Sequence, residues 1–189
     1  MPACKKAIVC YLTISFRIIQ RWSNRRQIDH GRRLTGLLKE QHRMKLRLNM
    51  IRYGAKAINT FEFVDPSGAK LPPFSAGAHV DLCLPNGLVR QYSLCNDPIE
   101  RSHYVLGVRL ESRGRGGSRC MHKNVHCGDL LDISPPTNSF PLNSKARRHL
   151  LIAGGIGITP VMSMLYALQH AQAEFEIYYC ARSPEHMAF

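Results

Sequence analysis

The chain has 189 residues, of which 44% are apolar, so it is long enough and apolar enough to bury a core, and wholesale disorder is excluded. Its net charge of +13 is unevenly placed, with +10 in residues 1–50 and only +3 in residues 51–189. Because the basic residues gather near the N-terminus, the charge does not indicate that the remainder binds nucleic acid.

Residues 1–44 form a basic N-terminal extension whose composition differs from that of the rest. Its apolar run at residues 7–16 is shorter than the roughly 20 residues that span a bilayer, so we expect no membrane span. An organellar transit peptide, a nucleic-acid-binding arm and read-through upstream of a start at Met44 are alternative interpretations. Since no strand or helix periodicity is sustained in the extension, we expect the fold and ligand binding not to need it.

Residues 45–143 consist of short alternating segments separated by turn signals. No long helical pattern interrupts them, and the spacing is typical of an antiparallel barrel. We therefore predict a six-stranded antiparallel β-barrel, with strands at Leu46–Ile51, Phe61–Val64, Ala78–Leu84, Val89–Leu94, Tyr104–Leu110 and Asp129–Ile133.

The pattern changes near His149, after a linker at residues 143–146. Leu150–Ala153 is a continuous apolar run, which predicts a strand buried on both faces. A glycine turn, a helical pattern over Pro160–His170 and a strand at Glu176–Cys180 follow. Residues 148–189 are therefore predicted to be an incomplete parallel α/β nucleotide-binding domain.

The glycine turn is the sequence Gly154-Gly155-Ile156-Gly157-Ile158-Thr159-Pro160. Glycines after a buried strand allow a ligand to approach the backbone, and free amides at the start of a helix favour an anion. The spacing is not G-x-G-x-x-G, so the usual dinucleotide fingerprint does not apply. A tight turn without a ligand is the alternative interpretation.

Two further motifs suit a flat ligand that carries a phosphate. In Arg90-Gln91-Tyr92-Ser93, strand alternation puts the arginine and the tyrosine on one face. Gly116-Gly117-Ser118 lies beside arginines and precedes a possible short helix at residues 119–123. Taken singly, an ordinary surface strand and a flexible glycine loop are the favoured explanations of these motifs.

The cysteines and histidines give no sign of a metal site. Seven cysteines are scattered without a C-x-x-C pair, which is typical of reduced thiols in a cytoplasmic protein. Among the nine histidines, His79, His103 and His122 are interpreted as residues at the core edge or surface. We expect no metal, no 2Fe–2S cluster and no catalytic acid or base.

In this order, the three motifs resemble the R-x-Y-S, G-G-x-S and G-G-x-G-x-T-P elements of the ferredoxin-reductase-like flavoprotein superfamily. The longer stretches LPNGLVRQYSLCNDP, GRGGS and ISPPTNSFPL look like the reductase components of phthalate dioxygenase and vanillate O-demethylase systems. The resemblance covers about residues 45–189 and implies an NAD(P)H-dependent flavin oxidoreductase.

The resemblance also implies residue roles. On the R-x-Y-S strand, Arg90 would hold the flavin phosphate, Tyr92 would pack on the isoalloxazine and Ser93 would bond the ring, with Gln91 between them. The remaining residues implied to contact the flavin are Gly107 and Val108, through their backbone, and Gly116, Gly117 and Ser118, around the phosphate.

On the nucleotide side, the resemblance places Thr159 near the flavin and the incoming nicotinamide. It places Arg182 on the adenosine side, and it implies that room for the cofactor is left by Gly154, Gly155 and Gly157. FMN is expected rather than FAD, and NADH is named with NADPH as the alternative.

The sequence departs from the resembled pattern because it lacks the cysteine cluster of a ferredoxin module. The expected acceptor is a terminal oxygenase component or a ferredoxin, but weak or no delivery of single electrons is expected from this chain alone. The nucleotide domain is expected to be cut short, as in a fragment, and a non-catalytic flavin-binding remnant is the alternative function.

Overall fold

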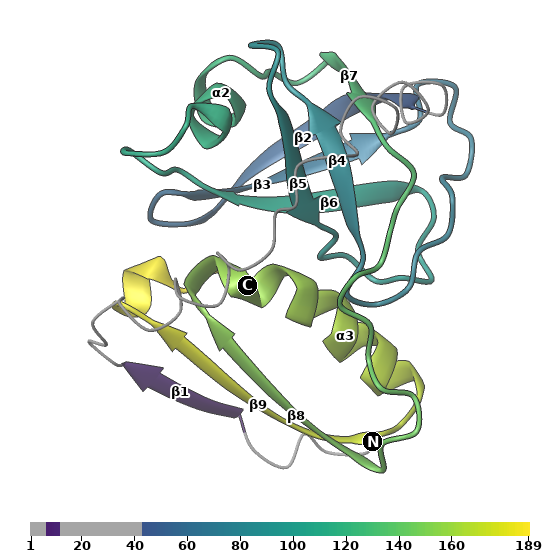
Figure 1. Cartoon of the computed structure of the whole chain (residues 1–189), viewed down its shortest axis with the longest axis vertical. Coiled ribbons are helices and arrows are strands. Elements are labelled where there is room, and N and C mark those ends of the chain that lie inside the picture. Colours follow the sequence, from purple (N-terminus) through teal and green to yellow (C-terminus); the bar gives the residue numbers. More distant parts are fainter. Residues whose placement is uncertain (1–6, 12–42) are drawn as a thin grey trace, which may run out of the picture.

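The computed structural model describes residues 7–11 and 43–189, which form a β-barrel and a smaller α/β unit (Figure 1). The barrel contains one short helix, α2 (Gly117–Lys123), and six strands: β2 (Met44–Ala55), β3 (Ile58–Val64), β4 (His79–Cys83), β5 (Val89–Ser93), β6 (His103–Arg109) and β7 (Leu130–Ile133). The α/β unit comprises β1 (Ala7–Tyr11), β8 (Arg148–Gly154), η2 (Gly155–Gly157), α3 (Ile158–His170), β9 (Glu174–Ala181) and η3 (Pro184–His186).

The six barrel strands lie in the order β5-β4-β7-β2-β3-β6 and pair antiparallel. A bridge between Leu94 and Leu106 brings the two ends of the sheet together. Alternate residues point inward, as the burial of Val80 and Leu82 on β4 illustrates, and they form one apolar core. The predicted six-stranded barrel is confirmed.

The hairpin between β4 and β5 fixes the register of the strand that carries the R-x-Y-S motif. Its turn is closed by hydrogen bonds from Gly87 N to Leu84 O and from Leu84 N to Leu88 O. Gly87 has a φ of 78°, which this turn requires and which glycine adopts without strain. The resulting register places Tyr92 opposite Val80 and Ser93 opposite His79.

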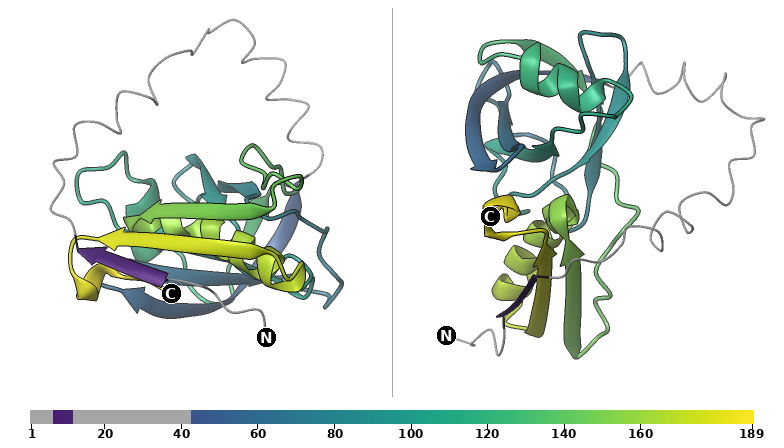
Figure 2. Two further views of the ribbon diagram at one scale, coloured as in Figure 1. Left: turned by 90° about the horizontal axis from the view of Figure 1, so that it is seen from below. Right: turned by 90° about the vertical axis from the view of Figure 1, so that its left-hand side faces the viewer.

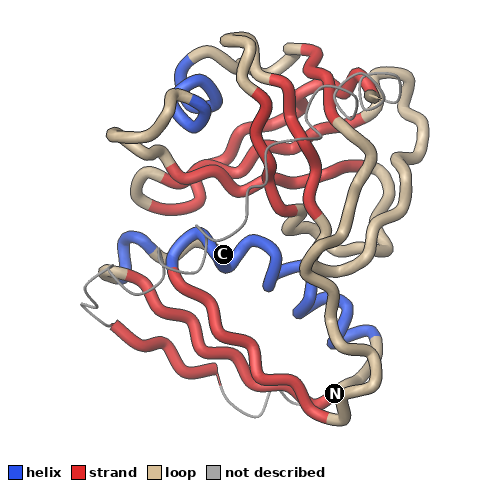
Figure 3. The backbone as a smooth tube through the Cα atoms, viewed as in Figure 1, coloured by secondary structure: helices blue, strands red, loops and turns tan. Residues whose placement is uncertain are grey.

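The α/β unit is built on a parallel sheet in the order β1-β9-β8. Helix α3 lies between this sheet and the barrel, as Figures 1 and 3 show. It buries Val161, Met164 and Leu168 against Leu151 and Tyr179 of the strands. The strand, glycine turn, helix and strand predicted over residues 149–183 are confirmed.

The prediction that Leu150–Ala153 is buried on both faces is wrong. Leu151 and Ala153 are buried under α3, but the side chains of Leu150 and Ile152 are 60% and 70% exposed. The left view of Figure 2 shows the three strands in front of α3, which covers only their far face. The apolar run matches a doubly covered sheet, but within the described residues only one helix packs on it.

The N-terminal extension contributes a strand that the sequence analysis did not predict. Strand β1 pairs in parallel with β9, from Ala7 opposite Ile177 to Tyr11 opposite Ala181. The run is only five residues long, too short for its periodicity to stand out. The segment proposed as a transit peptide or nucleic-acid-binding arm otherwise lies outside the described residues.

Within residues 7–11 and 43–189, no helix combines the length and the hydropathy that a membrane crossing requires.

Candidate functional site

Strand β5 presents its two sets of side chains to different surroundings, as its alternation predicts. On one face, Arg90 lies against Gly117 and Tyr92 packs on the barrel core. On the other face, Gln91 and Ser93 line a cavity beside the α/β unit. The predicted common face of Arg90 and Tyr92 is confirmed, and Ser93 lies on the opposite side of the strand.

Arg90 meets the glycine loop at the start of α2. A β-carbon on Gly117 would lie 2.7 Å from Arg90 Nε and 2.8 Å from its Cγ, so only glycine lets the arginine pack so closely. Gly116, with a φ of 89°, precedes the helix, and Ser118 Oγ accepts a hydrogen bond from Glu111 N (3.0 Å). Arg90 therefore lies directly beside the glycine backbone at the start of α2.

Tyr92 carries a partly buried phenol whose pKa is shifted upward. Burial raises the pKa of its phenol to about 12, although the nearby Arg90 acts in the opposite direction. Like any phenol at neutral pH, it is protonated, and the ring offers an apolar surface with one donor at its edge.

Strand β6 carries Gly107 to the boundary with the α/β unit. A β-carbon at Gly107 would lie 2.6 Å from Thr159 Cγ2 and 3.2 Å from Cζ of Phe189. Thr159 is buried, and its hydroxyl donates to Ile156 O (3.0 Å). The structure therefore brings Gly107 and Thr159 together, and the open side of Gly107 faces these two side chains. The carbonyl of the next residue, Val108, is bonded by His122 Nε2 (2.9 Å).

The predicted nucleotide turn lies at the end of β8. Gly154 and Gly157 are exposed, and no atom lies within 4 Å of a β-carbon built on either. A β-carbon built on Gly155 would lie 4.0 Å from Nη1 of Arg109. The guanidinium of Arg109 forms an ion pair with Glu111 (3.1 Å). This turn leaves open backbone beside a guanidinium.

Arg182 stands apart from the glycine loop of the barrel. It is exposed and follows β9, whereas Gly116, Gly117 and Ser118 belong to the barrel. The structure thus divides the predicted residues among five places: the Arg90–Gly117 contact, the cavity side of β5, the Gly107–Thr159 contact, the glycine turn at the end of β8 and the exposed end of β9.

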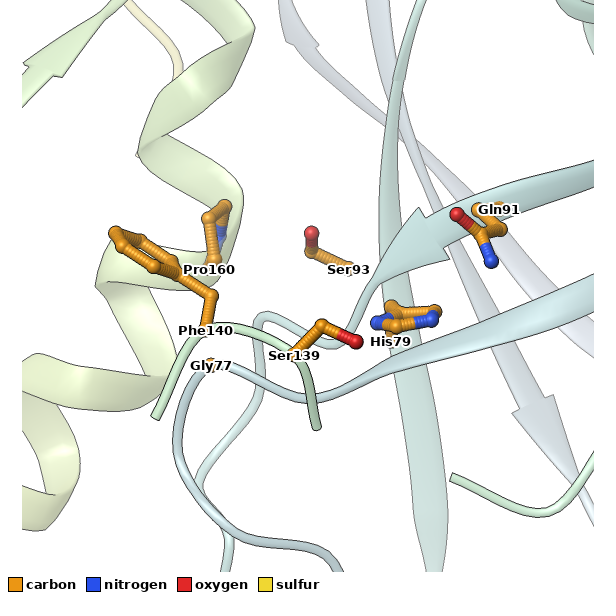
Figure 4. Close-up of a pocket in the computed structure, with 7 residues that line it drawn as sticks. All are labelled: Gly77, His79, Gln91, Ser93, Ser139, Phe140 and Pro160. Atoms are coloured by element: carbon orange, nitrogen blue, oxygen red, sulfur yellow. The ribbon is translucent and has the colours of Figure 1, made fainter. Parts of the chain in front are cut away.

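A cavity of about 270 Å³ lies between the two units, next to β5 and the start of α3 (Figure 4). Figure 4 shows Phe140 and Pro160 beside each other at one end and Gln91 at the other. The remaining lining residues are Gly77, His79, Ser93 and Ser139. Sequence reasoning missed most of them. The quoted stretch ISPPTNSFPL contains two of them, but nothing in its pattern showed that it would return to β4.

The histidines take structural positions, as predicted. His79 Nε2 bonds Thr137 Oγ1 (3.0 Å), His103 Nδ1 bonds Ser102 Oγ (2.9 Å), and the His122 ring packs edge-on against Phe61. Each of these three side chains therefore has a local partner.

Comparison with known proteins finds relatives along most of the described chain. The family model of the oxidoreductase NAD-binding domain matches residues 151–189. Tert-butanol monooxygenase / tert-amyl alcohol desaturase reductase subunit of Aquincola tertiaricarbonis is 47% identical over 146 residues, which are 77% of this chain and 43% of that protein. Vanillate O-demethylase oxidoreductase of Pseudomonas putida is 54% identical over 135 residues, 71% of this chain and 42% of that protein.

Among solved structures, phthalate dioxygenase reductase superposes with a TM-score of 0.77 at 44% identity. The match covers 79% of this chain and 47% of that one, which is described as a modular structure for electron transfer from pyridine nucleotides to [2Fe–2S]. The chain thus spans less than half the length of each of these three relatives.

Proposed function

Because the chain belongs to the ferredoxin-reductase-like flavoprotein superfamily, we propose that it binds FMN on its barrel and takes hydride from NADH. It would act as part of the reductase component of an aromatic-ring oxygenase or demethylase. The flavin-binding domain is proposed to span residues 45–143 and the partial NAD(P)-binding domain residues 148–189, with residues 1–44 as an extension.

The contact between Arg90 and Gly117 is the observation that carries this proposal. An arginine side chain packed on Gly117, in the loop that also carries the Ser118 hydroxyl, fits a phosphate group. Tyr92, one residue along the same face, would pack on the isoalloxazine with its apolar ring. FMN is preferred to FAD because of the resemblance to the phthalate dioxygenase reductase group.

The nucleotide would bind across the end of β8. The exposed backbone at Gly154 and Gly157 leaves room for the nucleotide. Thr159, beside Gly107, would form one side of the nicotinamide position. Arg182, at the end of β9, would meet the adenosine side. The flavin supplies the redox chemistry, and these residues supply position and electrostatics. NADH is proposed ahead of NADPH, and a titration with each separates the two.

The electron acceptor is proposed to be a terminal oxygenase component or a ferredoxin, since the relatives include a monooxygenase reductase subunit and a vanillate O-demethylase oxidoreductase. A cytoplasmic location is proposed because the scattered cysteines suit reduced thiols.

The experiment is an equilibrium titration of the chain with FMN. We expect Arg90→Ala to weaken binding by about 1.5–3 kcal/mol, the usual contribution of a hydrogen bond to a charged group. Arg47→Ala, which removes an exposed arginine from β2, is the charge-matched control and should leave affinity unchanged. Equal affinities for the Arg90→Ala variant and the unmodified chain would rule out the proposed phosphate site.

A further inference from the structure

One buried hydrogen bond joins the barrel to helix α3 beside the cavity. Gly77 N donates to Ser163 Oγ (3.0 Å), and the same hydroxyl donates to Pro160 O (2.9 Å). Ser163 is completely buried, so this bond is shielded from water. Its loss would leave the Gly77 amide buried without this acceptor, which is costly.

Gly77 is fixed in place by the segments around it. Its φ is 90°, and a β-carbon would lie 2.1 Å from Phe140 O and 2.8 Å from Met164 Cε. The neighbouring residues are held by Asn138, whose Nδ2 donates to Ser75 Oγ (2.7 Å) and Ala76 O (2.9 Å). The donor of the interdomain bond therefore has a defined position.

A short path connects this bond to β5, the strand proposed to hold the flavin. Ala78, which follows Gly77, accepts a hydrogen bond from Leu94 N (2.9 Å). Leu94 directly follows Ser93 at the end of β5. The backbone that ends the R-x-Y-S motif is thus two hydrogen bonds away from Ser163.

The other end of the path leads to the proposed nicotinamide position. Pro160 and Thr159 occupy the first turn of α3, and Ser163 lies one turn later on the same helix. Ser163 holds the Pro160 carbonyl, and Thr159 contacts Gly107 of the barrel. A single side chain therefore couples the start of α3 to the end of β5.

We propose that Ser163 is a positioning residue that sets the separation between Thr159 on α3 and strand β5. This separation in turn sets the alignment of nicotinamide and flavin. This inference rests on the proposed function, because the alignment matters only where hydride passes. Reacting atoms must approach to about 3–3.5 Å, and a misplacement of about 1 Å can cost two orders of magnitude in rate.

The test compares Ser163→Ala with a matched control, Ser134→Ala. Ser134 Oγ accepts from Asp81 N (2.9 Å) and donates to Pro135 O (2.9 Å), so it makes the same two kinds of bond within the barrel alone. Both variants are loaded with FMN, and flavin reduction by NADH is followed in anaerobic single turnovers. Amide hydrogen exchange is measured on the same samples.

We expect Ser163→Ala to lower the limiting rate of flavin reduction by on the order of tenfold or more. FMN affinity and the NADH concentration for half-maximal rate should change less than threefold, and Ser134→Ala should retain the original rate. Exchange should accelerate around Gly77 and around Pro160 in the Ser163→Ala variant only. A retained rate, or losses equal in both variants, overturns the positioning role.

A failure of the proposed function gives a different result. If the unmodified chain binds FMN but NADH does not reduce it, the proposed activity is wrong. The predicted effect of Ser163→Ala on the rate of flavin reduction is then wrong as well. Amide hydrogen exchange still tests whether the Gly77–Ser163 hydrogen bond joins the two units. Unchanged exchange at Gly77 in the Ser163→Ala variant would show that it does not.

Discussion

At Gly107 the barrel touches the α/β unit without room for a side chain. Because a β-carbon there would lie 2.6 Å from Thr159 Cγ2, Gly107→Ala should force the two units apart. We expect a loss of about 1–3 kcal/mol in the free energy of unfolding, the usual cost of overpacking. Urea unfolding measures it. Thr159→Ser removes the clashing methyl, so the double variant should regain part of the loss, and an additive double variant would contradict this contact.

Single residues were predictable from the sequence where a local rule applied. Alternation put Arg90 and Tyr92 on one face of β5, and the structure confirms it, since the intervening side chains line the cavity on the other face. The contact between Arg90 and Gly117, 27 positions later, could not be derived this way, because it depends on how α2 returns over the barrel. Ser163 gave no signal either, since a serine on a helix reveals nothing about an acceptor role toward a distant glycine.

At the level of elements, the strands and helices were predicted to within a few residues, and the errors came from surroundings. Leu150 and Ile152 belong to an apolar run that usually indicates double burial, yet α3 covers only the other face of β8. Strand β1 was missed because a five-residue run acquires its meaning only from its partner, β9.

Deleting residues 1–43 tests the role of β1. This strand pairs with β9 and with no strand of the barrel, so we expect unchanged FMN affinity and faster amide exchange along β9. Ile8→Pro combined with Val9→Pro in the full chain is the matched variant, because alternate amides of a strand face its neighbour and one of the two must be lost. A large loss of FMN affinity, or unaltered exchange on β9, would contradict this assignment.

At the scale of the whole molecule, burial makes the fold sensitive to alkaline pH. It raises the pKa of Tyr92 and of the Cys95 thiol to about 12, and it also raises the pKa of Tyr104 and Tyr179. The unfolded chain therefore loses these protons first as the pH rises. The stabilisation is complete below the ordinary values of 9.0 for the thiol and 10.0 for the phenols, and it is lost as the pH approaches about 12.

We expect the free energy of unfolding in urea to fall steadily between pH 9.0 and about 12. Tyr92→Phe should flatten the part of this decline that begins at the ordinary phenol pKa. Tyr53→Phe is the control, because that side chain is 77% exposed. Equal slopes for the two variants would show that Tyr92 is not shielded as described.

The division into a barrel and an α/β unit followed from the change of periodicity near His149, since alternation and helical spacing are local properties. The cavity between the units did not, because it forms only where residues 137–140 return past β4 to α3. Sequence patterns thus predicted each unit separately, whereas the packing of one unit against the other required the structure.

The most direct measurement of the central claim is an anaerobic absorption titration of the FMN-loaded chain with NADH. The account predicts stoichiometric flavin binding, followed by bleaching of the flavin absorbance on addition of NADH and its return with oxygen. A chain that binds no flavin would contradict the site at Arg90 and Gly117. A chain whose bound flavin stays oxidised in excess NADH and NADPH would contradict the proposed activity and leave a flavin-binding protein without turnover.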